Sequence, residues 1–280
     1  MKEFGIIGYP LGHSFSQKYF TEKFENEGLD ACYRLFPLEN IAQFPELIAS
    51  HPDLVGLNVT IPYKQAVIPY LDELSDDAKA MGAVNVIRVE RKGTAVKLIG
   101  HNSDFVGFRD SMESLLPMIQ ERDMAAQWLV PGSYILPGAR MYRPLQALVL
   151  GTGGASKAVV YALHQLDIPT QLVSRKAGLI DGQEVLCYEQ LNEEILSEYQ
   201  IIVNTTPLGM FPKVDACADI PYLYLSQSHL LYDVVYNPEE TLFLKKGRER
   251  GCFTKNGLEM LYGQAVEADR KEHTSELQSR

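Results

Sequence analysis

The chain is poor in cysteine, and the cysteines it has are scattered. Its 280 residues include four of them, and no two form a C-x-x-C pair. They are Cys32, Cys187, Cys217 and Cys252. Such spacing signals neither a disulfide framework nor a zinc site. We therefore expect no metal centre and a reducing location, the cytoplasm.

Long apolar runs and excess positive charge are also missing. No apolar run reaches the roughly 18 residues that suggest a membrane span, and the N-terminal apolar stretch is too short for a signal peptide. The net charge of −10 argues against a nucleic-acid surface. We expect a globular chain, 46% hydrophobic and long enough for two domains, with neither membrane nor nucleic acid as partner.

The most informative stretch is QALVLGTGGASKA, residues 146–158. Residues 147–150 have the composition of a buried parallel strand, and residues 157–165 that of a helix. The turn between them brings small residues to the helix N-terminus, where backbone N–H groups bind a pyrophosphate. These residues are Gly151, Gly153, Gly154 and Ala155. Ser156 replaces the third glycine of the usual pattern, so an ordinary strand-to-helix turn remains an alternative.

A second predicted strand, residues 170–173, ends in Ser174-Arg175-Lys176. This is the position at which a dinucleotide fold selects its ribose, and no carboxylate stands there to accept from a 2′-hydroxyl. A guanidinium suits a 2′-phosphate, so the sequence favours NADP(H) over NAD(H). The alternative is a solvated cation pair at a strand end.

The first half carries a strand with one polar face. Leu57, Val59 and Ile61 alternate with Asn58 and Thr60, which predicts one apolar face and one face of hydrogen-bonding groups.

Four further polar residues of this half have both an ordinary and a functional interpretation. Lys64 follows the polar strand and is either a solvated charge or part of a site at the carboxyl edge. Ser14 and Ser16, at the mouth of a helix over 17–27, are either caps or ligand contacts, and Asp104 either caps the helix over 106–116 or faces a ligand.

Several motifs together resemble the shikimate dehydrogenase family, in the family's order and over almost the whole chain. They are Ser14-x-Ser16, Asn58-Val59-Thr60-x-x-x-Lys64, Gly82-Ala83-Val84-Asn85, Asn102-Ser103-Asp104, Gly151-x-Gly153-Gly154-Ala155-Ser156 and Asn204-Thr205-Thr206-Pro207-Leu208-Gly209-Met210.

The resemblance implies an α/β fold with an N-terminal substrate domain, a Rossmann-like NADP domain and C-terminal helices that return to the first domain. We expect the substrate domain over 1–105, completed by 238–268, and the NADP domain over 106–237. An irregular, proline-broken insertion is expected near 117–144, and a polar tail outside the fold over 269–280.

The resemblance also implies NADP-dependent reduction of 3-dehydroshikimate to shikimate by a monomer or homodimer. It assigns Lys64 and Asp104 as the catalytic pair that handles the proton. The implied substrate contacts are Ser14, Ser16, Asn58, Thr60, Asn85, Tyr236 and Gln264. The implied cofactor contacts are Gly151, Gly153, Gly154, Ala155, Ser174, Arg175, Lys176, Thr205 and Gly257.

Two positions depart from the family pattern. Gln17 stands where a proline is frequent, and Phe105 where a glycine is frequent. A quinate-type dehydrogenase that uses NAD and a catalytically idle dinucleotide-binding regulator remain as alternatives. The Lys64 and Asp104 pair argues against the regulator.

Overall fold

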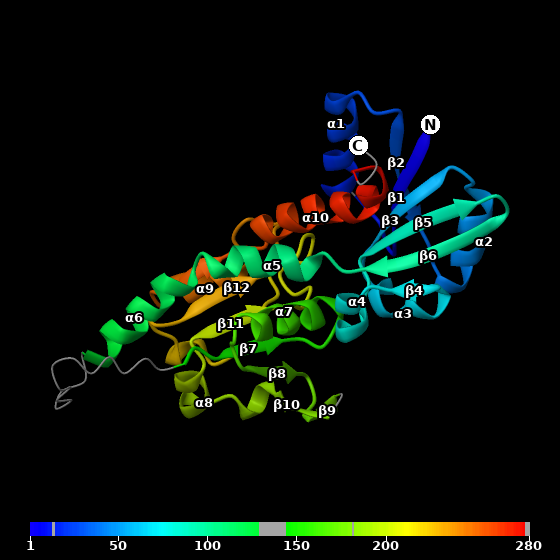
Figure 1. Ribbon diagram of the computed structural model, residues 1–280. Coiled ribbons are helices and arrows are strands. Elements are labelled where there is room, and N and C mark those ends of the chain that lie inside the picture. The colour runs from blue at the N-terminus through cyan, green and yellow to red at the C-terminus, as the bar shows by residue number, and fades with distance from the viewer. Residues whose placement is uncertain (13–14, 129–143, 181, 278–280) are drawn as a thin grey trace. The chain divides into compact units, whose positions relative to one another are not determined.

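The chain forms two compact α/β units. The computed structural model describes residues 1–12, 15–128, 144–180 and 182–277 (Figure 1). One unit comprises Met1–Asp104 with Gln264–Arg280, and the other comprises Phe105–Gly263. In the part of the chain described, no helix combines the length and the apolar composition needed to cross a membrane.

The first unit is built on a six-stranded mixed sheet of order β2-β1-β3-β5-β6-β4. β1 pairs in parallel with β2 and β3, whereas β5 pairs antiparallel with β3 and β6. The strands are β1 (Lys2–Gly8), β2 (Ala31–Pro37), β3 (Leu54–Val59), β4 (Glu73–Leu74), β5 (Val86–Lys92) and β6 (Ala95–His101). The helices and 3-10 turns are α1 (Phe15–Glu27), η1 (Ile41–Gln43), α2 (Phe44–Ser50), α3 (Tyr63–Ala66), η2 (Ile68–Tyr70) and α4 (Asp76–Met81).

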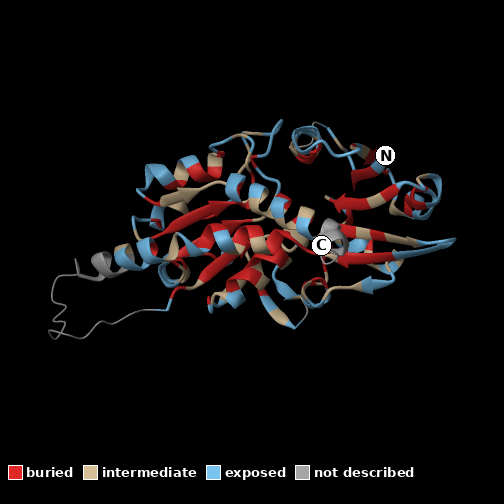
Figure 2. Ribbon diagram, turned by 45° about the horizontal axis from the view of Figure 1, so that its top comes forward, coloured by how far each residue is buried: buried red, intermediate tan, exposed pale blue. Residues whose placement is uncertain are grey.

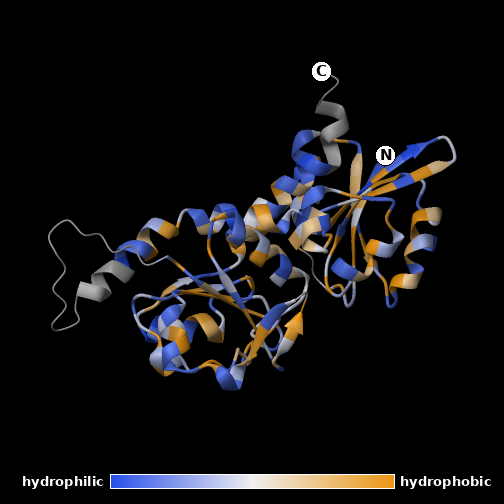
Figure 3. Cartoon of the chain, turned by 60° about the horizontal axis from the view of Figure 1, so that its bottom comes forward, coloured by the Kyte–Doolittle hydropathy of each residue, from blue (hydrophilic) through white to orange (hydrophobic). Residues whose placement is uncertain are grey.

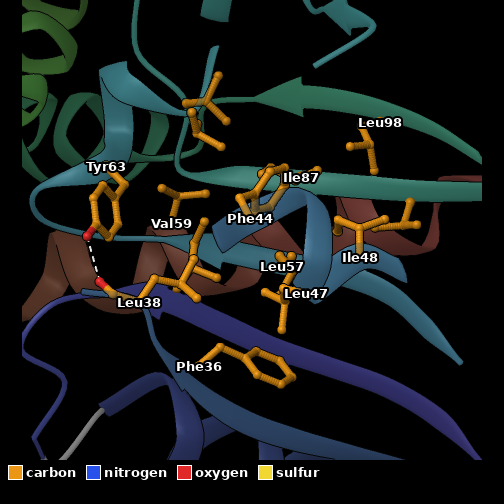
Figure 4. Close-up of a cluster of buried hydrophobic side chains, with 14 of the residues drawn as sticks. Phe36, Leu38, Phe44, Leu47, Ile48, Leu57, Val59, Tyr63, Ile87 and Leu98 are labelled. Atoms are coloured by element: carbon orange, nitrogen blue, oxygen red, sulfur yellow. Dashed lines mark hydrogen bonds between the residues drawn. The ribbon is translucent and has the colours of Figure 1, made fainter. Parts of the chain in front are cut away.

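Two apolar clusters cover the two faces of this sheet. Leu57 and Val59 of β3 lie in the cluster that packs against α2 (Figure 4). Asn58 lies between them in sequence and bonds Tyr33, a member of the other cluster, so the alternation predicted for this strand is confirmed. The strand ends at Val59, however, and Ile61 lies beyond it with 57% of its surface exposed.

The second unit is built on a seven-stranded sheet of order β13-β12-β11-β7-β8-β10-β9. All its pairings are parallel except that of β9 with β10. The strands are β7 (Ala147–Leu150), β8 (Thr170–Ser174), β9 (Gly178–Ile180), β10 (Gln183–Cys187), β11 (Ile201–Asn204), β12 (Leu230–Asp233) and β13 (Phe253–Lys255). The helices and 3-10 turns are α5 (Asp104–Glu113), α6 (Leu116–Trp128), α7 (Gly154–Gln165), η3 (Tyr188–Gln190), α8 (Glu193–Glu198), η4 (Tyr222–Tyr224), α9 (Leu242–Glu249) and α10 (Leu258–Leu277), of which α10 runs on into the first unit.

The central strands β7, β11 and β12 are buried along their whole length (Figure 2). Helices covering a parallel sheet on both faces require such continuous apolar strands, as the run at residues 147–150 predicted. The helices carry hydrophilic and hydrophobic residues together, as expected for elements with one face on a core (Figure 3).

The prediction of an irregular insertion near 117–144 is wrong for residues 117–128. Residues 116–128 form α6, and Pro117 stands at its second position, where a missing N–H costs no helical hydrogen bond. The helix is anchored by buried Ile119 and by the Arg122 guanidinium, 3.7 Å from the centre of the Phe253 ring. The remainder, 129–143, lies outside the described residues.

The predicted domain boundaries also differ from the two units. α9 and β13 were expected to complete the first domain, but β13 pairs with β12 of the second sheet. Only from Gln264 onward does the chain belong to the first unit.

The polar tail predicted from residue 269 is helical as far as Leu277. Asp269 lies 3.2 Å from Lys23 of α1, and the preceding Ala268 is buried. Arg270 and Lys271 both form ion pairs with Glu267. Pairs three and four residues apart stabilise a helix, and here they support the start of the segment that was predicted to be a tail.

Candidate functional site

The first unit brings a lysine and a carboxylate together. Lys64 of α3 lies 2.6 Å from the Asp104 Oδ2 atom, although forty residues separate them. Both side chains are largely withdrawn from solvent, with 17% and 8% of their surface exposed. A charge-assisted hydrogen bond of this length holds the amine in one place.

Asn85 fixes the other side of Asp104. Its Nδ2 donates to Asp104 Oδ1 at 2.8 Å, to Ser103 Oγ at 3.0 Å and, more weakly, to Gln264 Oε1 at 3.4 Å. Its Oδ1 accepts from the Ser103 N–H at 2.7 Å. Asn102 accepts from the Asp104 N–H at 3.0 Å, so both ends of the aspartate are held. Asn102 and Ser103 belong to the Asn102-Ser103-Asp104 motif, but no role was predicted for either. Their position next to Asp104 in the sequence could have indicated that they hold the aspartate.

Three polar groups of the first unit make no hydrogen bond to any described residue. They are Ser16 Oγ, Asn58 Nδ2 and Thr60 Oγ1. None belongs to the described buried atoms that lack a partner, so each reaches solvent. Thr60 follows β3 directly, and its N–H is bonded to Ile7 of β1. Hydroxyl and amide groups held in place without a protein partner can bind the hydroxyls or carboxylate of a small ligand.

The glycine turn of the second unit lies between β7 and α7. Gly151 has a φ of +113°, and a Cβ there would lie 2.7 Å from the Thr205 hydroxyl, so packing alone demands glycine. At Gly153 an added Cβ would meet no atom within 4 Å, so packing does not require glycine at this position. Gly153 is the N-cap of α7 without a side-chain bond, which leaves the first N–H groups of the helix open to an anion. Ser156 bonds the Gly151 carbonyl at 2.8 Å, which accounts for the residue in place of the third glycine.

The predicted cofactor residues follow adjacent strands. β7 lies between β8 and β11, and Leu150 is in register with both Val173 and Asn204. The turn after β7, residues 174–176 at the end of β8 and Thr205 after β11 therefore share one edge of the sheet. Arg175 and Lys176 are exposed, and no ion pair joins either to another residue of the described part.

A buried carboxylate beneath this edge was missed from the sequence. Asp233 accepts from Thr241 at 2.6 Å, and from Asn204 Nδ2 and the Val235 N–H at 3.0 Å each. Asn204 in turn accepts from Thr206 at 2.6 Å, so the network orders the loop after β11. Burial raises the pKa of Asp233 to about 6, against the opposing effect of its three hydrogen bonds.

This shift predicts a pH-dependent stability. Because the folded pKa of about 6 exceeds the ordinary 3.8, the Asp233 contribution to the free energy of unfolding is fully present below pH 3.8 and is lost as pH rises through 6. Asp233→Asn keeps an acceptor for Asn204 but cannot ionise. Relative to the wild type, we expect the variant to gain on the order of 1–3 kcal/mol between pH 4 and pH 7.5, measured from thermal midpoints. Exposed Asp219→Asn is the control, and equal differences at both pH values would contradict the assignment.

Three other predicted site residues have separate outcomes. Tyr236 is half-buried in the second unit, and burial raises its pKa. Gly257 also lies there, and a Cβ on it would lie 2.1 Å from the Val234 carbonyl oxygen, so its backbone packing already requires glycine. Ser14 lies outside the described residues.

Comparison with known proteins shows the family of the chain. Residues 6–87 match the model of the shikimate dehydrogenase substrate binding domain. The chain is 37% identical to shikimate dehydrogenase (NADP(+)) of Clostridium beijerinckii, over 96% of this chain and 91% of that protein. This chain belongs to the shikimate dehydrogenase family.

Solved structures of the family share the fold. The crystal structure of the Aquifex aeolicus shikimate dehydrogenase matches with a TM-score of 0.78 at 30% identity, over 98% of this chain and 92% of that chain. The quinate dehydrogenase of Corynebacterium glutamicum, solved in complex with NAD, matches with a TM-score of 0.75 at 28% identity, over 98% and 94%. The predicted fold class, an α/β chain with an N-terminal substrate domain and a Rossmann-like domain, is confirmed. Of the C-terminal helices expected to return to the first domain, α10 runs into the first unit and α9 does not.

Proposed function

We propose that the chain is a shikimate dehydrogenase that catalyses the reversible NADP-dependent reduction of 3-dehydroshikimate to shikimate. The observation that carries this proposal is the bonded Lys64–Asp104 pair in the unit that also presents Ser16 Oγ, Asn58 Nδ2 and Thr60 Oγ1 without a hydrogen bond to any described residue. The names of the curated relatives support the same activity.

The first unit is the substrate-binding part in this proposal. Ser14, Ser16, Asn58 and Thr60 bind the carboxylate and hydroxyls of shikimate, joined by Asn85, Gln264 and Tyr236. A site that hydrogen-bonds ring hydroxyls rejects analogues that lack them, because its own polar groups then stay unpaired.

The proton is handled by the Lys64–Asp104 pair. Bound NADP⁺ would supply the hydride chemistry, as the acceptor of the hydride from the C3–H bond when shikimate is oxidised. Lys64, in its neutral amine form, accepts the proton of the C3 hydroxyl and then releases it to solvent, and the C3–O bond becomes a carbonyl. Asp104 orients the amine through the 2.6 Å bond and is itself held by Asn85. In the reductive direction the same lysine returns the proton.

The residues of the second unit fit a phosphorylated dinucleotide. The open N-terminus of α7 and the unfilled space at Gly153 suit a pyrophosphate. Ser174, Arg175 and Lys176 take the 2′-phosphate, because the two exposed cations have no ion pair within the described chain that binding would have to break. Gly154, Ala155, Thr205 and Gly257 complete the proposed cofactor contacts.

The rival function is a quinate dehydrogenase that uses NAD, and the structural likeness to the Corynebacterium enzyme favours it as second candidate. The deciding experiment follows absorbance of the reduced nicotinamide with shikimate or quinate, each with NADP⁺ or NAD⁺. Highest kcat/KM for shikimate with NADP⁺ supports the proposal, and preference for quinate with NAD⁺ supports the rival. No turnover in any combination leaves a dinucleotide-binding regulator.

We further propose that the enzyme acts in the cytoplasm as a monomer or homodimer. Its scattered cysteines, none of which is paired in the structure, fit a reducing compartment. Light scattering after size-exclusion chromatography measures the oligomeric state.

Alanine substitutions at the two glycines of the turn, Gly153 and Gly151, should have opposite effects on cofactor binding and on stability. At Gly153 the backbone has a φ of −84° and the space is open, so Gly153→Ala should leave the thermal midpoint unchanged. Its methyl group would stand where the pyrophosphate approaches, and we expect the KM for NADP⁺ to rise about tenfold, roughly 1.4 kcal/mol.

Gly151→Ala is the contrasting control. The left-handed backbone and the contact with Thr205 should destabilise the folded state by on the order of 1–3 kcal/mol. If Gly153→Ala lowers the thermal midpoint as much and leaves KM unaltered, the turn has only a structural role.

A further inference from the structure

Tyr33 and Asn58 are joined across a strand. Tyr33 belongs to β2 and Asn58 to β3, and β1 lies between these two strands and pairs with both. The Tyr33 hydroxyl nevertheless donates to Asn58 Oδ1 at 2.5 Å. Each side chain is buried, with 6% of the residue exposed.

The ring that carries this hydroxyl is held by aromatic packing. Tyr33 stacks on Phe20 of α1, with ring centres 5.1 Å apart and planes at 5°. Phe20 in turn contacts Phe24, and both are almost fully buried. Because the packing fixes both the position and the plane of the Tyr33 ring, its hydroxyl is held at one point. The hydrogen bond to Asn58 is therefore preorganised.

The two ends of the Asn58 amide are therefore not equivalent. An asparagine amide has an acceptor oxygen and a nitrogen with two donor hydrogens, and the two ends have nearly the same size. Tyr33 occupies the oxygen, whereas the nitrogen bonds no described residue and reaches solvent. Without the tyrosine hydroxyl, rotation about the last side-chain bond would exchange the two ends at little cost.

We infer that Tyr33 is a positioning residue that holds the Asn58 amide with its nitrogen toward the ligand, so that Asn58 donates to an acceptor oxygen of the substrate. The inference rests on the proposed function for the identity of that substrate. It makes Asn58 a hydrogen-bond donor in the site. Asn58 then bonds a lone pair of a carboxylate or hydroxyl oxygen and accepts no hydrogen bond from a substrate hydroxyl.

The first test is kinetic. Tyr33→Phe keeps the ring and its stacking but removes the hydroxyl, and we expect the KM for shikimate to rise about tenfold while kcat changes less than threefold. The KM for NADP⁺ should stay unchanged.

Tyr63→Phe is the matched control. Tyr63 is also 6% exposed and donates its hydroxyl at 2.5 Å, but to the Leu38 carbonyl, so it orients no side chain (Figure 4). It should lower the thermal midpoint as Tyr33→Phe does and leave the KM for shikimate unaltered. A similar rise in KM for both variants would overturn the inference, since it would report a general loss of stability.

A double-mutant cycle then tests whether Tyr33 acts through Asn58. In an Asn58→Ala background, Tyr33→Phe should raise the KM for shikimate no further. If the two effects multiply, Tyr33 acts by another route and the inference fails.

An activity-independent readout separates this inference from the proposed function. In protein labelled with ¹⁵N on asparagine, the Asn58 side-chain amide is identified by its loss in Asn58→Ala. It should give a sharp pair of resonances in the wild type and a broadened or averaged pair in Tyr33→Phe. A sharp pair in both overturns the inference even if shikimate is oxidised, and broadening supports it even if the wild type proves inactive on shikimate.

Discussion

Replacing Lys64 by alanine should lower kcat for shikimate oxidation by about 10²- to 10⁴-fold, the range typical of general acid–base groups. The substrate is held mainly by hydroxyl and amide groups in the proposed site, so its KM should change far less. An interaction needed chiefly in the transition state affects kcat in this way. Initial rates at saturating NADP⁺ over a range of shikimate concentrations measure both constants.

Lys64→Arg distinguishes proton transfer from charge. Arginine keeps the positive charge beside Asp104 but cannot lose a proton, so this variant should be nearly as slow as alanine. Lys97→Ala is the matched control, because Lys97 of the same unit also pairs with a carboxylate, Glu73, but at an exposed position. Full activity in Lys64→Arg would assign the lysine an electrostatic role only, and full activity in Lys64→Ala would remove it from the mechanism.

Elements whose signal is local were predictable from the sequence. Strand β7 and the glycine turn after it lie where the pattern indicated, because a buried strand, a turn and an amphipathic helix leave a continuous signature. Helix α6 was missed because the chain was interpreted as an irregular insertion from Pro117 onward, although proline in the first helical turn is permitted.

Contacts made at long range were not predictable in the same way. The role of Asn85 as a substrate contact stays a prediction, and its bonds to Asp104 and Gln264 bridge 19 and 179 residues. No periodicity reveals such pairs, because they depend on how β5, α5 and α10 are brought together. The Tyr33–Asn58 bond is similar, since a tyrosine in a half-buried strand normally signals only packing.

The charge at the end of β8 leads to the second large expected effect, on cofactor choice. Arg175→Asp should raise the KM for NADP(H) by one to two orders of magnitude, roughly 1.4 kcal/mol per tenfold. A 2′-phosphate carries close to two negative charges, and the variant replaces attraction by repulsion. NAD(H) has a 2′-hydroxyl that can donate to the new carboxylate, so its KM should stay the same or fall.

A charge reversal elsewhere on the same sheet is the necessary control for that result. Arg250 is exposed like Arg175 but precedes β13, at the edge opposite to the carboxyl ends of β7 and β8. Arg250→Asp changes the net charge by the same amount, so a general electrostatic effect on an anionic dinucleotide would appear in both variants. The ratio of kcat/KM for NADP⁺ to that for NAD⁺ should fall only in Arg175→Asp, because only that position is proposed to face the ribose. If both cofactors weaken equally in Arg175→Asp, or if the wild type already prefers NAD⁺, Arg175 is an ordinary surface charge and selectivity must come from other residues beside β8.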